Sequence, residues 1–136
     1  MTYEIQKKAQ NVFRETWENL TQTDPEFVKI VANFSQSETV QASKLTEKER
    51  MLCILSALLG CQSLGEFRNM LHVALENGME PIVVKEVLYQ AAAYLGIGRI
   101  HDFLTAANEV MEQHGIQLPL APQGTTEENT RFEKEL

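Results

Sequence analysis

Apolar residues recur at helical spacing along almost the whole chain, and no segment shows convincing strand alternation. A recurrence every three or four residues places side chains on one face of an α-helix. The chain is therefore predicted to be all-α. Six helices are expected, in chain order: from Thr2 to Leu20, from Asp24 to Phe34, from Thr46 to Gly60, from Leu64 to Asn77, from Ile82 to Leu95, and from Gly98 to about His114.

Two short motifs are typical of helix beginnings. Thr23-Asp24-Pro25-Glu26 combines a capping residue with a proline suited to the first helical position, and Thr46 and Glu49 have the spacing of a capping box. Between these two helices, Ser35 to Lys44 is polar and is interpreted as a connection with room for one turn of helix around 38–42. The buried stripe of the second helix is expected to comprise Phe27, Ile30, Val31 and Phe34.

The length of 136 residues suits one domain, or one domain with a tail. Residues 1–118 are expected to form the helical domain. Residues 119–136 are expected to form an arm, because Pro119, Pro122 and Gly124 cannot continue a helix and few apolar residues follow them. Such an arm would contact a partner subunit or begin a further segment.

Twelve basic and nineteen acidic side chains give a net charge of −7. An acidic protein repels phosphate groups, so neither nucleic acid nor an anionic membrane surface is expected as a partner. No apolar run approaches the roughly 20 residues of a membrane span, and the first ten residues lack the apolar stretch of a signal peptide. These features favour the cytoplasm. Two cysteines, Cys53 and Cys61, fit a reducing compartment and are expected to be small buried residues.

Four segments, most specific between Leu45 and Gly98, resemble the carboxymuconolactone decarboxylase family. They are Leu45–Arg50, Gly65–Arg68, Ala74–Gly78 and Lys85–Gly96. The resemblance covers roughly Thr2 to Leu118. It implies a six-helix bundle of the alkyl hydroperoxidase D-like type with a central antiparallel helical hairpin. It also implies assembly with copies of itself, as a homotrimer or homohexamer.

The family contains two chemical classes. One decarboxylates γ-carboxymuconolactone, and the other uses a Cys-x-x-Cys pair to reduce peroxides or disulfides. In this chain the positions that match the two cysteines are Ser63 and Glu66, neither of which can carry out thiol chemistry. The resemblance therefore favours a lyase over a thiol peroxidase.

The decarboxylase motif Glu-Phe-Arg-x-His matches Glu66 to Met70, so a methionine stands at the family's histidine position. His72 lies two residues later, roughly 200° around the helix. Glu66, one turn from Met70, is expected to be the general acid/base of the same pocket. The alternative role for Glu66 is a solvated helix charge.

The remaining site residues are expected to bind a small acidic metabolite. Arg50 and Arg68 would hold its anionic groups, Gln90 and Tyr94 would line the wall, and His101, with Arg99, would form a cationic mouth. The full expected site is Arg50, Glu66, Arg68, Met70, Gln90, Tyr94 and His101. Each residue could instead lie on the surface or in a subunit interface.

No cofactor is expected, and no metal, because the three histidines lie in different segments without ligand spacing. Three functions stay open at this point. The first is a lyase acting on an acidic lactone, the second a peroxiredoxin-type or alkylhydroperoxidase-type oxidoreductase, and the third a non-catalytic homo-oligomeric binding module. Met70 favours the third, because a thioether carries no proton.

Overall fold

The structure is a computed structural model that describes residues 18–122. Within that range the chain is helical and contains no strand, which confirms the predicted all-α class. None of these helices is long and apolar enough to cross a membrane. The elements are α2 (Glu18–Thr23), α3 (Pro25–Asn33), the π-helix η1 (Phe34–Glu38), α4 (Thr39–Ala42), α5 (Glu47–Gly60), α6 (Leu64–Glu76), α7 (Pro81–Leu95) and α8 (Ile97–Gln113).

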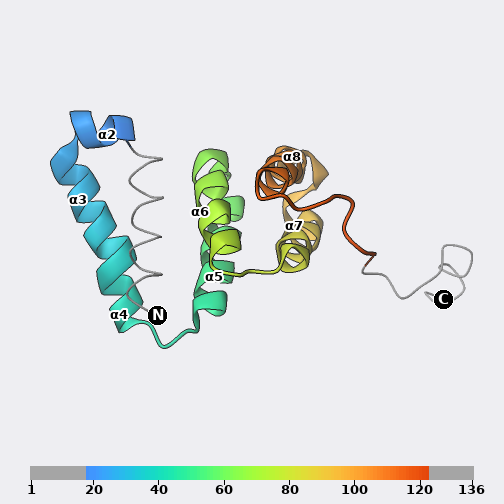
Figure 1. Ribbon diagram of the computed structural model, residues 1–136, viewed down its shortest axis with the longest axis horizontal. Coiled ribbons are helices and arrows are strands. Elements are labelled where there is room, and N and C mark those ends of the chain that lie inside the picture. The colour runs from blue at the N-terminus through green and yellow to red at the C-terminus, as the bar shows by residue number, and fades with distance from the viewer. Residues whose placement is uncertain (1–17, 123–136) are drawn as a thin grey trace, which may run out of the picture.

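Helices α5 to α8 pack as two hairpins (Figure 1). Three residues join α5 to the antiparallel α6, and Gly96 alone joins α7 to α8. Gly96 has φ 88° and ψ 147°, a conformation open essentially only to glycine. Helix α6 lies against α8 and α5 lies against α7, so that the two hairpins stack on each other. The boundaries of these four helices agree with the sequence-based prediction to within one or two residues.

The core lies between these two hairpins. At its centre the rings of Phe67 and Phe103 meet edge to face, with their centroids 5.1 Å apart. Helix α5 contributes Met51, Leu55 and Leu59, which recur every four residues on one face. Helices α6 and α8 contribute most of the other core side chains. The buried cluster is Met51, Leu55, Leu59, Phe67, Met70, Leu71, Val73, Ala74, Met79, Val84, Leu88, Ile100, Phe103, Ala107, Val110 and Met111.

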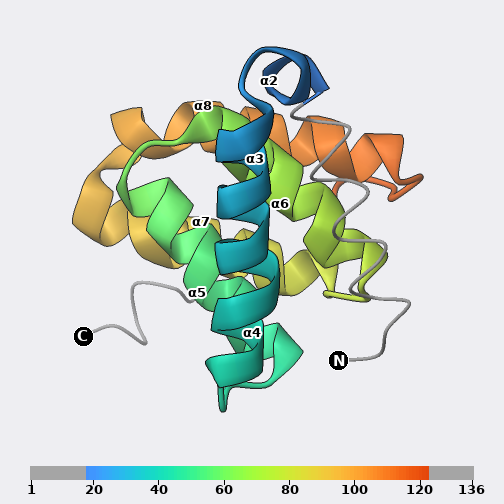
Figure 2. The same cartoon turned by 90° about the vertical axis from the view of Figure 1, so that its left-hand side faces the viewer.

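Helices α3, η1 and α4 form one continuous rod beside this body (Figures 1 and 2). The expected turn of helix around 38–42 is confirmed by α4, whereas the prediction of a connection was wrong for Ser35 to Ser37, which are helical in η1. The hydroxyl of Ser35 donates to the carbonyl oxygen of Val31 at 2.7 Å, and that of Thr39 donates to the carbonyl oxygen of Ser35 at 2.9 Å. Polar side chains that bond to the preceding turn are compatible with a helix.

The predicted apolar stripe of this rod is largely exposed. Phe27, Ile30 and Phe34 are 55%, 67% and 61% exposed, and Val31 is half-buried, whereas Val28 is buried. The prediction of a buried stripe was therefore wrong for three of its four residues. The stripe is exposed because helices α5 to α8 do not pack over this face of the rod.

Of the two predicted helix-start motifs, only the one at Thr46 forms its capping hydrogen bonds. The Thr46 hydroxyl accepts from the amide of Glu49 at 3.2 Å, and the Glu49 carboxylate accepts from the amide of Thr46 at 2.8 Å, which confirms the capping box. The hydrogen bond from the Thr46 amide, followed by the effect of the Thr46 hydroxyl, lowers the pKa of the Glu49 carboxyl. The Thr23-Asp24-Pro25-Glu26 motif makes no side-chain capping bond: the Thr23 hydroxyl lies 2.6 Å from the Asp24 carboxylate, to which it donates, and 3.2 Å from the carbonyl oxygen of Asn19. Most of the first predicted helix, and arm residues 123–136, lie outside the described residues.

Candidate functional site

A groove of about 430 Å³ runs between α5 and α7. Three polar side chains of α7, each one turn after the last, lie along it: Glu86, Gln90 and Tyr94. The Gln90 amide is 3.5 Å from the Glu86 carboxylate, and Tyr94 is 90% exposed. The groove has the size of a small-molecule site. Its complete lining is Ser56, Leu59, Val83, Glu86, Val87, Gln90, Ala91, Tyr94 and Leu95.

Two expected site residues, Glu66 and Met70, lie on α6 and not in this groove. The carboxylate of Glu66 is half-buried and accepts a hydrogen bond from the Asn69 amide at 3.0 Å. Met70 is 6% exposed and packs in the core cluster. The thioether, which the motif resemblance aligns with a histidine, is thus enclosed by apolar side chains.

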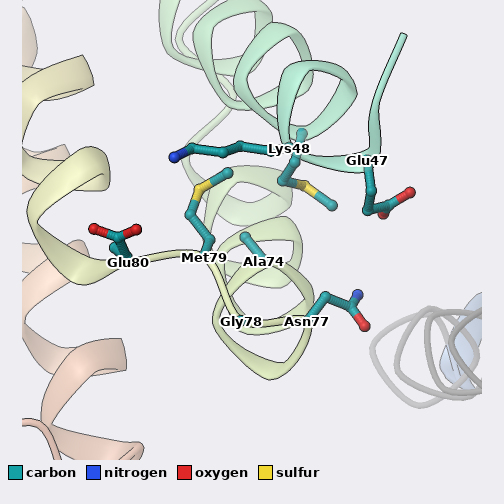
Figure 3. A pocket seen from close by; sticks show the side chains of 8 residues that line it. Glu47, Lys48, Ala74, Asn77, Gly78, Met79 and Glu80 are labelled. Carbon is teal, nitrogen blue, oxygen red and sulfur yellow. The ribbon is translucent and has the colours of Figure 1, made fainter. Parts of the chain in front are cut away.

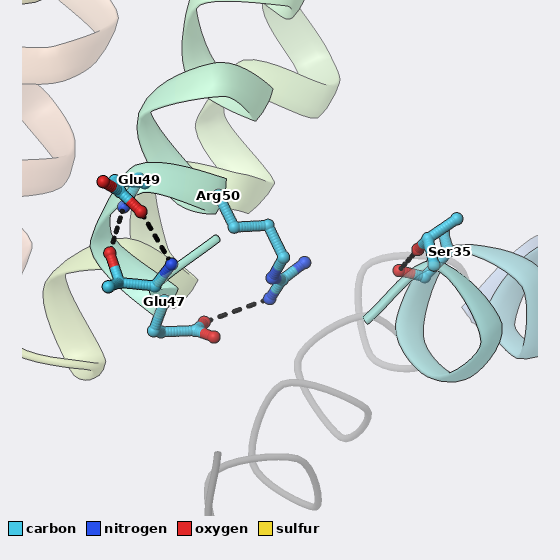
Figure 4. A network of polar contacts seen from close by, with 6 residues as sticks. Ser35, Glu47, Glu49 and Arg50 are labelled. Carbon is cyan, nitrogen blue, oxygen red and sulfur yellow. Dashed lines mark hydrogen bonds and ion pairs between the residues drawn. The ribbon is translucent and has the colours of Figure 1, made fainter. Parts of the chain in front are cut away.

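The two expected anion-binding arginines already have carboxylate partners. Arg50 is 9% exposed and its Nη2 lies 3.0 Å from Glu47 Oε1 (Figure 4), while its buried Nε has no hydrogen-bond partner among residues 18–122. Arg68 Nη1 lies 2.7 Å from Glu109 Oε2. Any anionic ligand at either arginine would have to compete with these carboxylates.

His101 is the fifth residue of α8, and its ring nitrogen is 3.7 Å from the Asp102 carboxylate. Its side chain is 78% exposed. Arg99, two residues before it, is also exposed. Because Gly96 alone separates α7 from α8, these two side chains follow closely after Tyr94, the last polar residue of the groove.

Both cysteines are exposed free thiols, so the prediction of buried cysteines was wrong. Cys53 lies two residues after the buried Met51, which turns it roughly 200° away from the core face of α5. Cys61 caps the end of the same helix, and its thiol is 3.5 Å from the carbonyl oxygen of Leu58. Eight helical residues separate the sulfurs by about 12 Å along the axis, beyond the reach of a disulfide.

A second hollow, of about 220 Å³, lies where the start of α5 meets the turn between α6 and α7. Lys48 and Glu80 lie on one side of it, and Glu47 and Asn77 on the other (Figure 3). It is smaller than most ligand sites, and none of the expected site residues lines it.

Two histidines from different segments meet, which sequence spacing alone did not indicate. His72 Nδ1 lies 2.9 Å from His114 Nε2. His114 is held by the end of α8, where the amides of Gly115 and Ile116 bond back to the carbonyls of Glu112 and Met111. The pKa of His72 is lowered by burial, by the neighbouring His114 and by Arg68. The Glu76 carboxylate raises it. Within residues 18–122, no three metal-ligating side chains gather together.

Comparison with known proteins identifies one relationship. The model of the carboxymuconolactone decarboxylase family matches residues 25–109, from the start of α3 into α8. No curated protein and no solved structure matches the chain. The match spans more than half of the chain and includes the groove, Glu66 and Met70.

Proposed function

The chain belongs to the carboxymuconolactone decarboxylase family, and we propose that it is a homo-oligomeric lyase acting on a small acidic lactone in the α5–α7 groove. The observation that carries this proposal is the row of Glu86, Gln90 and Tyr94 along a groove of ligand size. We also propose that its helices adopt the six-helix alkyl hydroperoxidase D-like arrangement, with the α5–α6 hairpin at the centre.

The chemistry requires a proton carrier. Loss of CO₂ from a γ-carboxylactone leaves an extended enolate that must be protonated, and a positioned carboxylic acid can supply that proton. Glu86 is the carboxylate that lines the groove, and it is half-buried. Gln90 and Tyr94 can donate hydrogen bonds to the lactone oxygens, where negative charge develops. Glu66 is the competing acid/base, because the family motif contains it.

The substrate carboxylate requires a positive region, and no lysine or arginine lines the described groove. We propose that the carboxylate binds at the end nearest α8. There Arg99 and His101 are exposed near the start of α8, and the helix N-terminus adds a partial positive charge. Arg50 and Arg68 could contribute only after release from Glu47 and Glu109.

Assembly into a homotrimer or homohexamer is part of the proposal. It is supported by large apolar side chains that are exposed where α7 meets α8: Tyr94 at 90% and Ile97 at 71%. Apolar side chains grouped on a surface are typical of protein contacts. The two exposed free thiols fit a reducing compartment, which we propose to be the cytoplasm.

The test is turnover of γ-carboxymuconolactone by the purified protein, followed by CO₂ release and by the absorbance of the enol-lactone. We expect Glu86→Gln to lower kcat by about 100-fold or more, and Glu66→Gln to leave it nearly unchanged. The reverse result would assign the acid/base to Glu66. Absence of turnover by the unmodified protein would rule out this activity.

A second candidate function is a non-catalytic homo-oligomeric binding module. It is favoured by Met70, which packs in the apolar core where the family places a histidine. Thermal-shift measurements with small carboxylates and lactones separate the two functions, since a binding module would be stabilised by ligands that it does not convert. The thiol-peroxidase alternative is disfavoured by the separation of Cys53 from Cys61 along α5.

A further inference from the structure

A lysine is buried on the flank of α7 that faces α8. Lys85 is 8% exposed, and its ammonium donates to the side-chain oxygen of Asn108 on α8. No carboxylate of the described residues lies within ion-pair distance of it. A buried ammonium with a neutral partner lacks the compensating charge that such groups usually have.

This lysine lines a pocket of about 660 Å³. The walls come from α7, from α8 and from residues 118–122, which pass beside them. The volume lies within the range of small-molecule sites. Consecutive helical residues point about 100° apart, so Lys85 faces α8 while the neighbouring Glu86 faces the groove with α5. The lining is Ile82, Lys85, Tyr89, Asn108, Glu112, Leu118, Pro119, Leu120, Ala121 and Pro122.

Burial also changes the protonation of this amine. Removal from water disfavours the charged form and lowers the pKa of Lys85. A larger fraction of the amine is then neutral near pH 7, and the neutral amine is the nucleophile. The exposed amines of Lys29, Lys44 and Lys48 lack this burial and serve as comparisons within the same chain.

We propose that Lys85 is the nucleophilic amine of a second small-molecule site, which forms an imine with a small aldehyde or 2-oxo acid. The amine nitrogen attacks the carbonyl carbon, and the carbonyl π pair moves to the oxygen, which takes a proton. The nitrogen loses a proton to give a neutral carbinolamine. The hydroxyl group then leaves as water while the C=N bond forms, so that amine and carbonyl yield imine and water.

Two further groups of the pocket can carry these protons. Tyr89 lies one turn after Lys85 on α7, and Glu112 lies one turn after Asn108 on α8, so that both line the same space. A carboxylate can accept the proton from nitrogen, and a protonated group can assist departure of water. The site is separate from the α5–α7 groove and does not depend on the lyase proposal.

The test uses glyoxylate and sodium cyanoborohydride, which converts an imine into a stable amine, with peptide mapping by mass spectrometry. At pH 7 we expect Lys85 to be labelled about threefold or more faster than Lys29, Lys44 and Lys48. At pH 10, where the exposed amines also lose protons, this advantage should shrink. Labelling of Lys85 no faster than that of the exposed lysines at pH 7 would overturn the proposal.

Asn108→Asp provides a matched variant. A carboxylate beside the amine favours its charged form, so the variant should lose the advantage of Lys85 over the exposed lysines at pH 7. The exposed lysines of the same sample report any general change in folding. Unchanged labelling of Lys85 in this variant would contradict control of the amine by its buried surroundings.

Discussion

The imidazole rings of His72 and His114 meet across α6 and α8, with Nδ1 of the first 2.9 Å from Nε2 of the second. At this distance one ring nitrogen donates and the other accepts, which requires at least one neutral ring. Protonation of both rings would replace the hydrogen bond with two facing donors. The pair therefore couples the packing of α6 on the end of α8 to pH.

The first prediction concerns stability against pH. The pKa of His72 is lowered below its ordinary value of 6.5, mainly by burial. The unfolded chain therefore takes up this proton before the folded chain does, and the free energy of unfolding decreases as the pH falls from 6.5 through the lowered pKa. Urea unfolding at a series of pH values between 5 and 8 measures the slope.

His72→Gln should flatten that slope, since the titrating group is removed. His101→Gln is the matched control, because His101 is exposed near the start of α8 and, among the described carboxylates, only that of Asp102 lies within ion-pair distance of it. An unchanged slope in His72→Gln would show that other groups cause the pH dependence.

The second prediction compares two ion pairs. Arg50 is 11% exposed in its side chain and Arg68 is 36% exposed. Glu47→Gln removes the carboxylate that pairs with the buried Arg50 among the described residues and should cost about 1–3 kcal/mol. Glu109→Gln breaks a partly exposed pair and should cost less than about 1 kcal/mol. Denaturant midpoints of the two variants check the order, and equal costs would contradict it.

The third prediction concerns Met70, which the motif resemblance aligns with a histidine. Met70 is 6% exposed among apolar side chains, so Met70→His buries a polar ring without an evident partner and should cost roughly 1–3 kcal/mol. Met70→Leu keeps an apolar side chain and should cost less than about 1.5 kcal/mol. A stable Met70→His variant with a gain of lactone turnover would show that the core opens to admit a site here.

The helix boundaries from Thr46 onward could be predicted because their signals are local. The capping box at Thr46 and Glu49 and the glycines after α6 and α7 act within a few residues. Gly78, with φ 86°, lets the amide of Met79 bond back to Ala74, which ends α6 as the sequence indicates.

The pairings between segments could not be predicted in the same way. His72 meets His114 across 42 residues and Lys85 meets Asn108 across 23, and both contacts depend on how whole helices pack. A stripe such as that of Phe27 and Ile30 shows which face is apolar but not what covers it. The groove residues Gln90 and Tyr94 were found from the family motif, whereas Lys85 showed only as a charge within an apolar run.

The fourth prediction compares two helix N-termini. Thr46→Ala removes the hydroxyl that accepts from the amide of Glu49 and should cost about 1 kcal/mol. Asp24→Ala should cost less, because the Asp24 side chain makes no capping bond to α3. Thermal unfolding of both variants measures the difference, and an equal loss would contradict a special role for the capping box.

The last prediction concerns assembly. Ile97 is 71% exposed at the first position of α8, beside the exposed Tyr94. Ile97→Glu adds a charge that a helix N-terminus accommodates, so the fold should be retained while an apolar subunit contact is disrupted. Size-exclusion chromatography with light scattering should show an oligomer for the unmodified chain. The variant should already be dissociated at protein concentrations about tenfold or more above the one at which the unmodified oligomer dissociates. Thr105→Glu, on an exposed part of α8, should assemble normally. A monomeric unmodified chain, or an Ile97→Glu variant that assembles like it, would exclude this corner of the molecule as the subunit contact.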